Sequence, residues 1–110
     1  MFNSEAFSEE AKEFLDNYDM EIKVVEYFHN YFDNYCKTHQ KIFNRVLKNY
    51  DLSKIETWIQ SVSLEVYNWP ELDYQNIVIT LGISSNDEHV GSYELFCDLD
   101  GTVVKETFKI

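Results

Sequence analysis

A chain of 110 residues is the size of one domain, and its 45% hydrophobic and 16% aromatic residues can form a core without disulfides or metals. The net charge of −11 argues against binding to nucleic acids, which needs a cationic face, and against adsorption to anionic membranes. No apolar run approaches the ~20 residues of a membrane span, and the acidic N-terminal segment does not have the features of a signal peptide. With two cysteines and no disulfide framework, we expect a cytoplasmic protein.

Helical periodicity runs through the first half of the chain. Ser4 or Ser8 can cap a first helix. The apolar stripe of this helix comprises Phe7, Ala11, Phe14, Leu15 and Tyr18. A second helix is predicted after Asp19, and its apolar residues step by three and four over residues 25–46.

The length of this second helix is a problem for a compact domain. A straight helix over residues 20–50 would be ~45 Å long, whereas a domain of this size has a radius of gyration of ~13 Å. We therefore expect a break near residues 37–40. Ser53 and Glu56 then have the spacing of a capping box, which predicts a short helix to about Gln60.

The hydrophobic period changes to two at residue 62. Val62, Leu64 and Val66 alternate, and a second alternating run covers residues 77–83, in which Gly82 is a candidate bulge. Two more runs, residues 91–99 and 102–110, complete four predicted strands.

Helices followed by strands predict the α+β class. We expect a single domain, residues 1–110, with a helical part over about 4–60 and a β-meander over about 62–110. Two to four N-terminal helices would pack on one face of a four-stranded antiparallel meander sheet.

The stretch DLDGTV, residues 98–103, resembles the opening motif of the haloacid-dehalogenase-like phosphatases. In that family the first aspartate, here Asp98, is the phosphoryl-accepting nucleophile, and the second, here Asp100, is the general acid/base. The family's motif ends a buried parallel strand, which should read as continuous apolar residues, but Ser92 and Glu94 interrupt this run. The family's downstream motifs also have no counterpart in the eight residues after Thr102. We interpret the stretch as a hairpin turn.

A two-residue loop at Asp100-Gly101 would fix the register of the last two strands. The cross-strand pairs would include Leu99–Thr102, Cys97–Val104, Leu95–Glu106, Tyr93–Phe108 and Gly91–Ile110. One sheet face would then hold the apolar residues Tyr93, Leu95, Cys97, Leu99, Val104, Phe108 and Ile110. Three exceptions remain, because Glu106 falls on this face while Phe96 and Val103 fall on the polar one.

Two sets of Cys and His residues have spacings that could in principle support catalysis or metal binding. His29 and Cys36 share one helical edge with Asp33, but the Cys–His step spans ~10 Å, too far for direct proton transfer. Cys36 and His39 could supply two zinc ligands, but a structural zinc site needs four. We therefore expect no catalytic residues, no metal and no cofactor.

Charge is distributed unevenly along the chain. Residues 1–26 carry a net −6 and residues 55–110 a net −8, whereas residues 37–54 carry +4. The basic segment could lie against the acidic ones within the molecule. Alternatively, the surplus negative charge steers a cationic protein partner.

Aromatic residues exceed what one small core requires, and Tyr and Trp in an acidic rim are typical of a protein-binding hot spot. The predicted partner-binding residues are Tyr67, Trp69, Glu71, Asp73, Tyr74, Asp87 and Glu88. The competing interpretation is that these rings cover the edges of the core.

In its small size, acidity and aromatic content, the whole chain resembles the bacterial immunity proteins of nuclease toxins. The resemblance implies a non-enzymatic inhibitor with a cationic toxin domain as its partner. It rests on no motif, so it assigns no residues. The first alternative is a structural or adaptor domain, homodimeric through the stripe of residues 25–46. The second is a phosphatase-type enzyme that uses Asp98 and Asp100.

Overall fold

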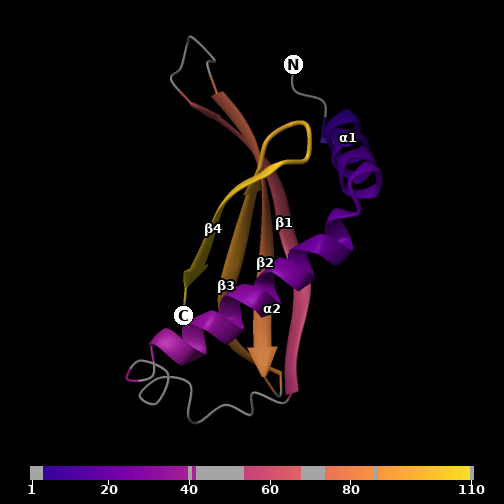
Figure 1. The fold of residues 1–110 in the computed structure, drawn as a ribbon. Helices are drawn as coiled ribbons and strands as arrows, with labels where there is room; N and C mark the ends of the chain where they lie inside the picture. Colours follow the sequence, from indigo (N-terminus) through magenta and orange to yellow (C-terminus); the bar gives the residue numbers. More distant parts are fainter. Residues whose placement is uncertain (1–3, 40, 42–53, 68–73, 86, 110) are drawn as a thin grey trace.

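The computed structural model describes residues 4–39, 41, 54–67, 74–85 and 87–109, without the side chains of residues 4–7, 67 and 74. The elements in chain order are α1 (Ser4–Asn17), α2 (Met20–Thr38), β1 (Ile55–Tyr67), β2 (Tyr74–Ser85), β3 (Glu88–Cys97) and β4 (Val103–Lys109). The strands form one antiparallel sheet in the order β1-β2-β3-β4 (Figure 1). The predicted α+β fold, two helices followed by a four-stranded meander, is confirmed.

Helix α2 runs diagonally across one face of the sheet (Figure 1). Its buried residues are spaced by four and form one stripe: Met20, Val24, Phe28 and Phe32. This stripe packs in one core with the inward residues of β2 and β3, which are Ile79, Leu81, Ile83, Tyr93, Leu95 and Cys97. Burial of each large apolar side chain contributes about 1.5–3 kcal/mol, so this stripe is the main attachment of α2 to the sheet.

Helix α2 ends within the segment where a break was expected. The backbone of His39 leaves the helical region, with φ −122° and ψ 46°, while its N–H still donates to the Tyr35 carbonyl. The His39 ring stacks on the Tyr35 ring at a centroid distance of 4.5 Å. Thr38 donates its hydroxyl to the Asn34 carbonyl at 2.9 Å, which helps to satisfy the end of the helix. The rest of the predicted helix, residues 42–50, lies outside the described residues.

The predicted short helix up to Gln60 is wrong, and so is the boundary between helical part and meander. Strand β1 begins at Ile55, and Ser53 lies outside the described residues. The first half of β1 pairs with β2 through Ile55–Ser85, Thr57–Ile83 and Ile59–Leu81. These three β1 residues are β-branched and alternate along the chain, which favours a strand over the helix that a capping-box spacing suggests.

The predicted bulge at Gly82 is also wrong, because Gly82 pairs regularly with Trp58 in β1 and with Ser92 in β3. The irregularity in β1 lies between Ile59 and Ser61. A Cβ atom at Gly82 would lie 2.2 Å from Cζ2 of Trp58. The glycine therefore provides the space in which the indole ring approaches the backbone of β2.

The hairpin turn at residues 98–103 is confirmed, but its loop has three residues, Leu99-Asp100-Gly101. The Asp98 N–H donates to the Thr102 carbonyl at 2.8 Å, and the Gly101 N–H donates to the Asp98 carbonyl at 3.0 Å. Gly101 has a φ of +88°, and a turn followed by a left-handed glycine is a common three-residue hairpin loop. The predicted Leu99–Thr102 pair is therefore wrong.

A bulge in β4 restores the predicted register beyond this loop. Cys97 pairs with Val103 instead of Val104, and the next pair is Phe96–Lys105. The remaining described pairs follow the prediction, including Leu95–Glu106 and Tyr93–Phe108. Because of the bulge, Val103 packs against the core and Val104 is 43% exposed, the reverse of the prediction. Ile110 lies outside the described residues.

Candidate functional site

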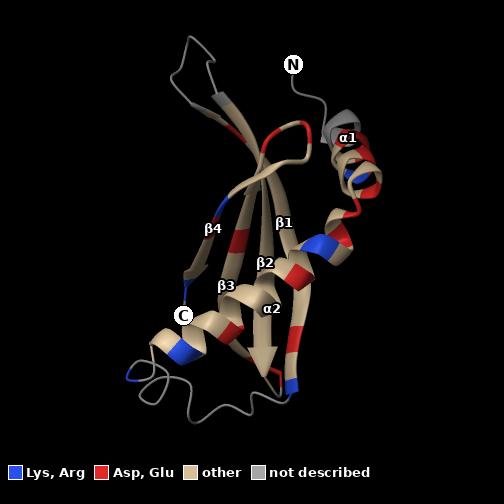
Figure 2. Ribbon diagram, viewed as in Figure 1, with Lys and Arg blue, Asp and Glu red and all other residues tan. Residues whose placement is uncertain are grey.

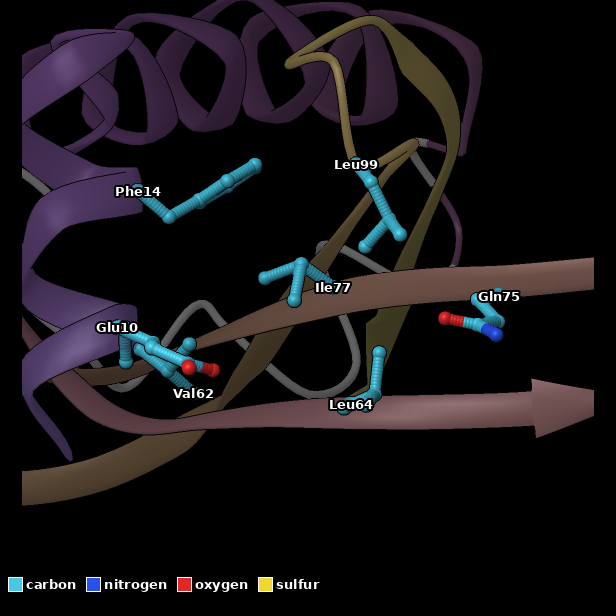
Figure 3. Close-up of a pocket in the computed structure, with 8 residues that line it drawn as sticks. Glu10, Phe14, Val62, Leu64, Gln75, Ile77 and Leu99 are labelled. Carbon is cyan, nitrogen blue, oxygen red and sulfur yellow. The ribbon is translucent and has the colours of Figure 1, made fainter. Parts of the chain in front are cut away.

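An apolar groove of about 300 Å³ lies between α1 and the helix-facing side of the sheet. The residues that line it come from α1, β1, β2 and the β3–β4 loop: Glu10, Ala11, Phe14, Val62, Leu64, Gln75, Ile77 and Leu99. Figure 3 shows Phe14 and Leu99 projecting from two sides toward Ile77 on the floor. We call this site the groove.

The groove exists because the core-facing side of the sheet extends beyond α2. Leu64 and Leu99 are 42% and 52% exposed, although they belong to that side of the molecule. Val66, two residues along β1 from Leu64, is 38% exposed. Large apolar side chains left uncovered next to one another are typical of an interaction site.

The β3–β4 loop holds Leu99 in place at the groove. Gly101 lies against the Tyr18 ring at the end of α1, where an added Cβ would be 2.5 Å from Cδ1. Asn76 in β2 donates its side-chain amide to the Cys97 carbonyl at 3.2 Å and to Oδ1 of Asp98 at 3.4 Å. The loop is thus attached to a helix and to a strand, so Leu99 is presented on a fixed support.

The side chain of Asp100 in the same loop stabilises the turn. Its carboxylate accepts the Thr102 N–H at 3.0 Å, and this hydrogen bond lowers the pKa of Asp100 below its ordinary value. Asp98 and Asp100 therefore act in the described structure as hydrogen-bond acceptors that shape the loop around Leu99.

Carboxylates lie on α1 next to the groove. Glu10 lines it, and Glu9 and Glu13 are exposed on the same helix, where red segments alternate with tan ones and one blue segment in Figure 2. A smaller hollow of about 130 Å³ at the α1–α2 junction is lined by Leu15, Asp16, Asp19, Glu21 and Ile22. Ile22 is 64% exposed, so this hollow again combines an apolar side chain with carboxylates.

The structure separates the predicted partner-binding residues into two groups. Tyr67 and Tyr74 form a cross-strand pair at one end of the sheet, next to the Val66–Gln75 pair that adjoins the groove. Asp87 and Glu88 lie at the β2–β3 turn, beyond the other end of β2. The 12 residues of β2 separate the groups by roughly 40 Å. Trp69, Glu71 and Asp73 lie outside the described residues.

Sequence reasoning missed Leu99 as a surface residue, because it places this residue on an apolar sheet face. Phe14, which the sequence places on the apolar stripe of the first helix, is partly buried against the core and also lines the groove. The signal that could have identified Leu99 is its position: an aliphatic side chain in a tight hairpin loop between two aspartates has little opportunity to be buried.

The surroundings of Cys36 in α2 and of His39, the residue after this helix, do not favour nucleophile activation. Burial, and secondarily the nearby Asp33 carboxylate, raises the pKa of the Cys36 thiol, the opposite of nucleophile activation. His39 instead stacks on Tyr35 and lies 2.8 Å from the Thr38 hydroxyl through Nδ1. Among the described residues, no group of three His, Cys, Asp or Glu side chains could hold a metal ion.

Within the described ranges, no helix has the length and hydrophobicity required to cross a membrane. Comparisons of the chain with protein-family models, with curated proteins and with solved structures give no match.

Proposed function

We propose that the protein is a non-enzymatic binding domain that neutralises a basic protein partner, in the manner of an immunity protein acting on a cationic toxin domain. The observation that supports this proposal best is the groove. It combines exposed apolar walls, Leu64 and Leu99, with the carboxylates of α1.

The two parts of the site would contribute in different ways. The net charge of −11 and the exposed carboxylates of α1 would steer a cationic partner and accelerate association. The apolar walls would then bind a side chain of the partner. A few such buried contacts supply most of the affinity in protein interfaces.

The alternative of a homodimer through residues 25–46 has less support. In the described part of this stripe, Phe28 and Phe32 are buried against the sheet of the same chain, and Val25 packs against the same core. These side chains are not available to a second copy.

Co-expression tests the proposed function. The product of the neighbouring reading frame in the native genome would be produced alone and together with this protein, and growth would be measured. We expect growth arrest alone, rescue in co-expression and a stable complex. A neighbouring product that is neither toxic nor bound by this protein would contradict the proposal.

A further inference from the structure

Strand β1 has a free edge in the described structure. It pairs with β2 on one side, and no described strand pairs with its other side. Its 13 residues form the longest strand of the sheet, and they include no Pro, Lys or Arg. An edge strand offers a row of backbone N–H and C=O groups to which another extended chain can add.

Apolar exposure is concentrated on this strand. Trp58, Leu64 and Val66 are 43%, 42% and 38% exposed, and no described side chain of β1 is fully buried. Natural edge strands are commonly protected by being short, by lysines or by bulges. A long edge with exposed apolar side chains and no lysine is suited to pairing.

The opposite edge, β4, is better protected by its length and its charge. It is seven residues long and carries Lys105 and Lys109, although the pairing of each edge strand includes one irregularity. The sheet is therefore asymmetric, and an added strand is favoured on β1.

Within β1, residues 61–67 are the segment next to the groove. The irregularity between Ile59 and Ser61 separates this segment from the first half of the strand. Val62 and Leu64 line the groove, while Ser61 and Ser63 are exposed on the alternate side. A strand added here would place every second side chain beside Leu64 and the groove.

We infer that the free edge of β1, at residues 61–67, binds an extended basic segment of the partner by strand addition. This inference rests on the proposed function, from which it takes the partner's basic character. Alternate apolar side chains of the segment would lie beside Leu64 and Val66. The cationic side chains of the segment would lie in the negative field of the whole chain, to which Glu10 at the groove contributes. A second copy of this chain is disfavoured as the occupant because each copy carries −11.

A synthetic peptide of nine residues, with alternating valine and lysine, tests this inference on the wild-type protein. One control peptide has the same composition with the valines placed together, and a second alternates valine and glutamate. Residue-resolved amide hydrogen exchange would be measured by NMR with and without each peptide. We expect the valine–lysine peptide to bind with a Kd below about 1 mM. We also expect it to slow exchange of alternate amides within residues 61–67 by about tenfold or more, because strand pairing engages every second residue.

Every other result overturns the inference. Binding that shifts the methyl signals of Ile77 and Leu99 without slowing these amides would show docking in the groove alone and would leave the proposed function standing. Three results would each contradict the addition of a basic strand to β1. They are equal protection of these amides by the glutamate peptide, protection of the amides of β4 instead, and no binding of the valine–lysine peptide. Protection of residues 61–67 without peptide, together with a dimer in sedimentation, would identify a second copy as the occupant. Failure of the proposed function itself is recognised separately, by the co-expression experiment.

Discussion

The ring of Tyr18 lies against the backbone of Gly101 so closely that a Cβ atom at Gly101 would stand 2.5 Å from Cδ1 of the ring. This contact joins the end of α1 to the β3–β4 loop, two segments more than 80 positions apart in the chain. It places Leu99 opposite Phe14 across the groove (Figure 3). The geometry of the groove therefore depends on a position where no side chain fits.

The first prediction concerns this contact. Gly101→Ala should lower the free energy of unfolding by about 2–4 kcal/mol, because alanine at a φ of +88° is strained and its Cβ overlaps the Tyr18 ring. Urea denaturation measures the loss. Gly101→Asn is the matched control, since asparagine tolerates positive φ but still carries a Cβ. If asparagine is as stable as glycine, the backbone conformation alone matters and the ring contact does not.

The second prediction concerns a partly buried hydrogen bond under α2. Tyr93 is fully buried and donates its hydroxyl to Oε1 of Glu106 at 2.5 Å. Burial, then the hydrogen bond and charge of Glu106, raises the pKa of Tyr93 well above its ordinary value, with smaller contributions from Tyr27 and Tyr31. Tyr93 in the folded state therefore keeps its hydroxyl proton at a pH at which Tyr93 in the unfolded chain loses it. The raised pKa of Tyr93 therefore contributes stability to the folded state that is complete below pH ~10, the ordinary pKa of tyrosine. This contribution is lost as the pH rises from there toward the pKa of Tyr93 in the folded state.

Tyr93→Phe checks this dependence. Near neutral pH it should cost about 1–3 kcal/mol, because the half-buried Glu106 carboxylate loses its donor. Between pH 9 and 11, the stability of the variant should decline less steeply than that of the wild type. Parallel curves of unfolding free energy against pH would contradict the assignment. Tyr35→Phe, at a partly buried tyrosine of α2 that is not among the groups that raise the pKa of Tyr93, is the control.

Much of the sheet could be predicted because most of its residues alternate. The Tyr93–Phe108 pair follows from the segregation of apolar from polar side chains, which a one-residue slip would destroy, and it fixes the Leu95–Glu106 pair as well. The loop was one residue too short in the prediction because Asp-Gly fits both two-residue loops and three-residue loops with a left-handed glycine. The bulge at Val104 absorbs the difference, so the error stayed local.

The groove could not be predicted in the same way. Periodicity identifies which side of a strand is apolar, but it does not identify where a covering helix ends. Leu64 and Ile79 lie on the same side of the sheet and look equivalent in the sequence, yet Leu64 is 42% exposed and Ile79 is buried under α2. That difference arises from the position of α2 on the sheet, which depends on tertiary packing.

The third prediction separates the groove from the rest of the apolar surface. Leu99→Ser should weaken binding of the valine–lysine peptide about tenfold, since roughly 1–2 kcal/mol of apolar contact is lost. The unfolding free energy should change by less than about 0.5 kcal/mol, because Leu99 is already 52% exposed. Val104→Ser is the matched control, with 43% exposure on the far edge strand, and should leave the affinity unchanged. Equal effects on the peptide affinity would show that the groove has no special role.

The last prediction concerns the carboxylates of α1. The triple variant Glu9→Gln, Glu10→Gln, Glu13→Gln should bind the valine–lysine peptide about three- to tenfold more weakly at 50 mM NaCl, since each exposed charge contributes up to ~1 kcal/mol. The control variant Glu26→Gln, Asp33→Asn, Glu88→Gln has the same net charge, and its changes are at exposed positions away from the groove. Calorimetric titrations between 50 and 500 mM NaCl should show a weaker salt dependence for the α1 variant than for the wild type. If both variants lose affinity equally, overall charge attracts the peptide and α1 does not; if only the α1 variant does, its carboxylates act locally, within the ~10 Å range that 0.1 M salt leaves unscreened.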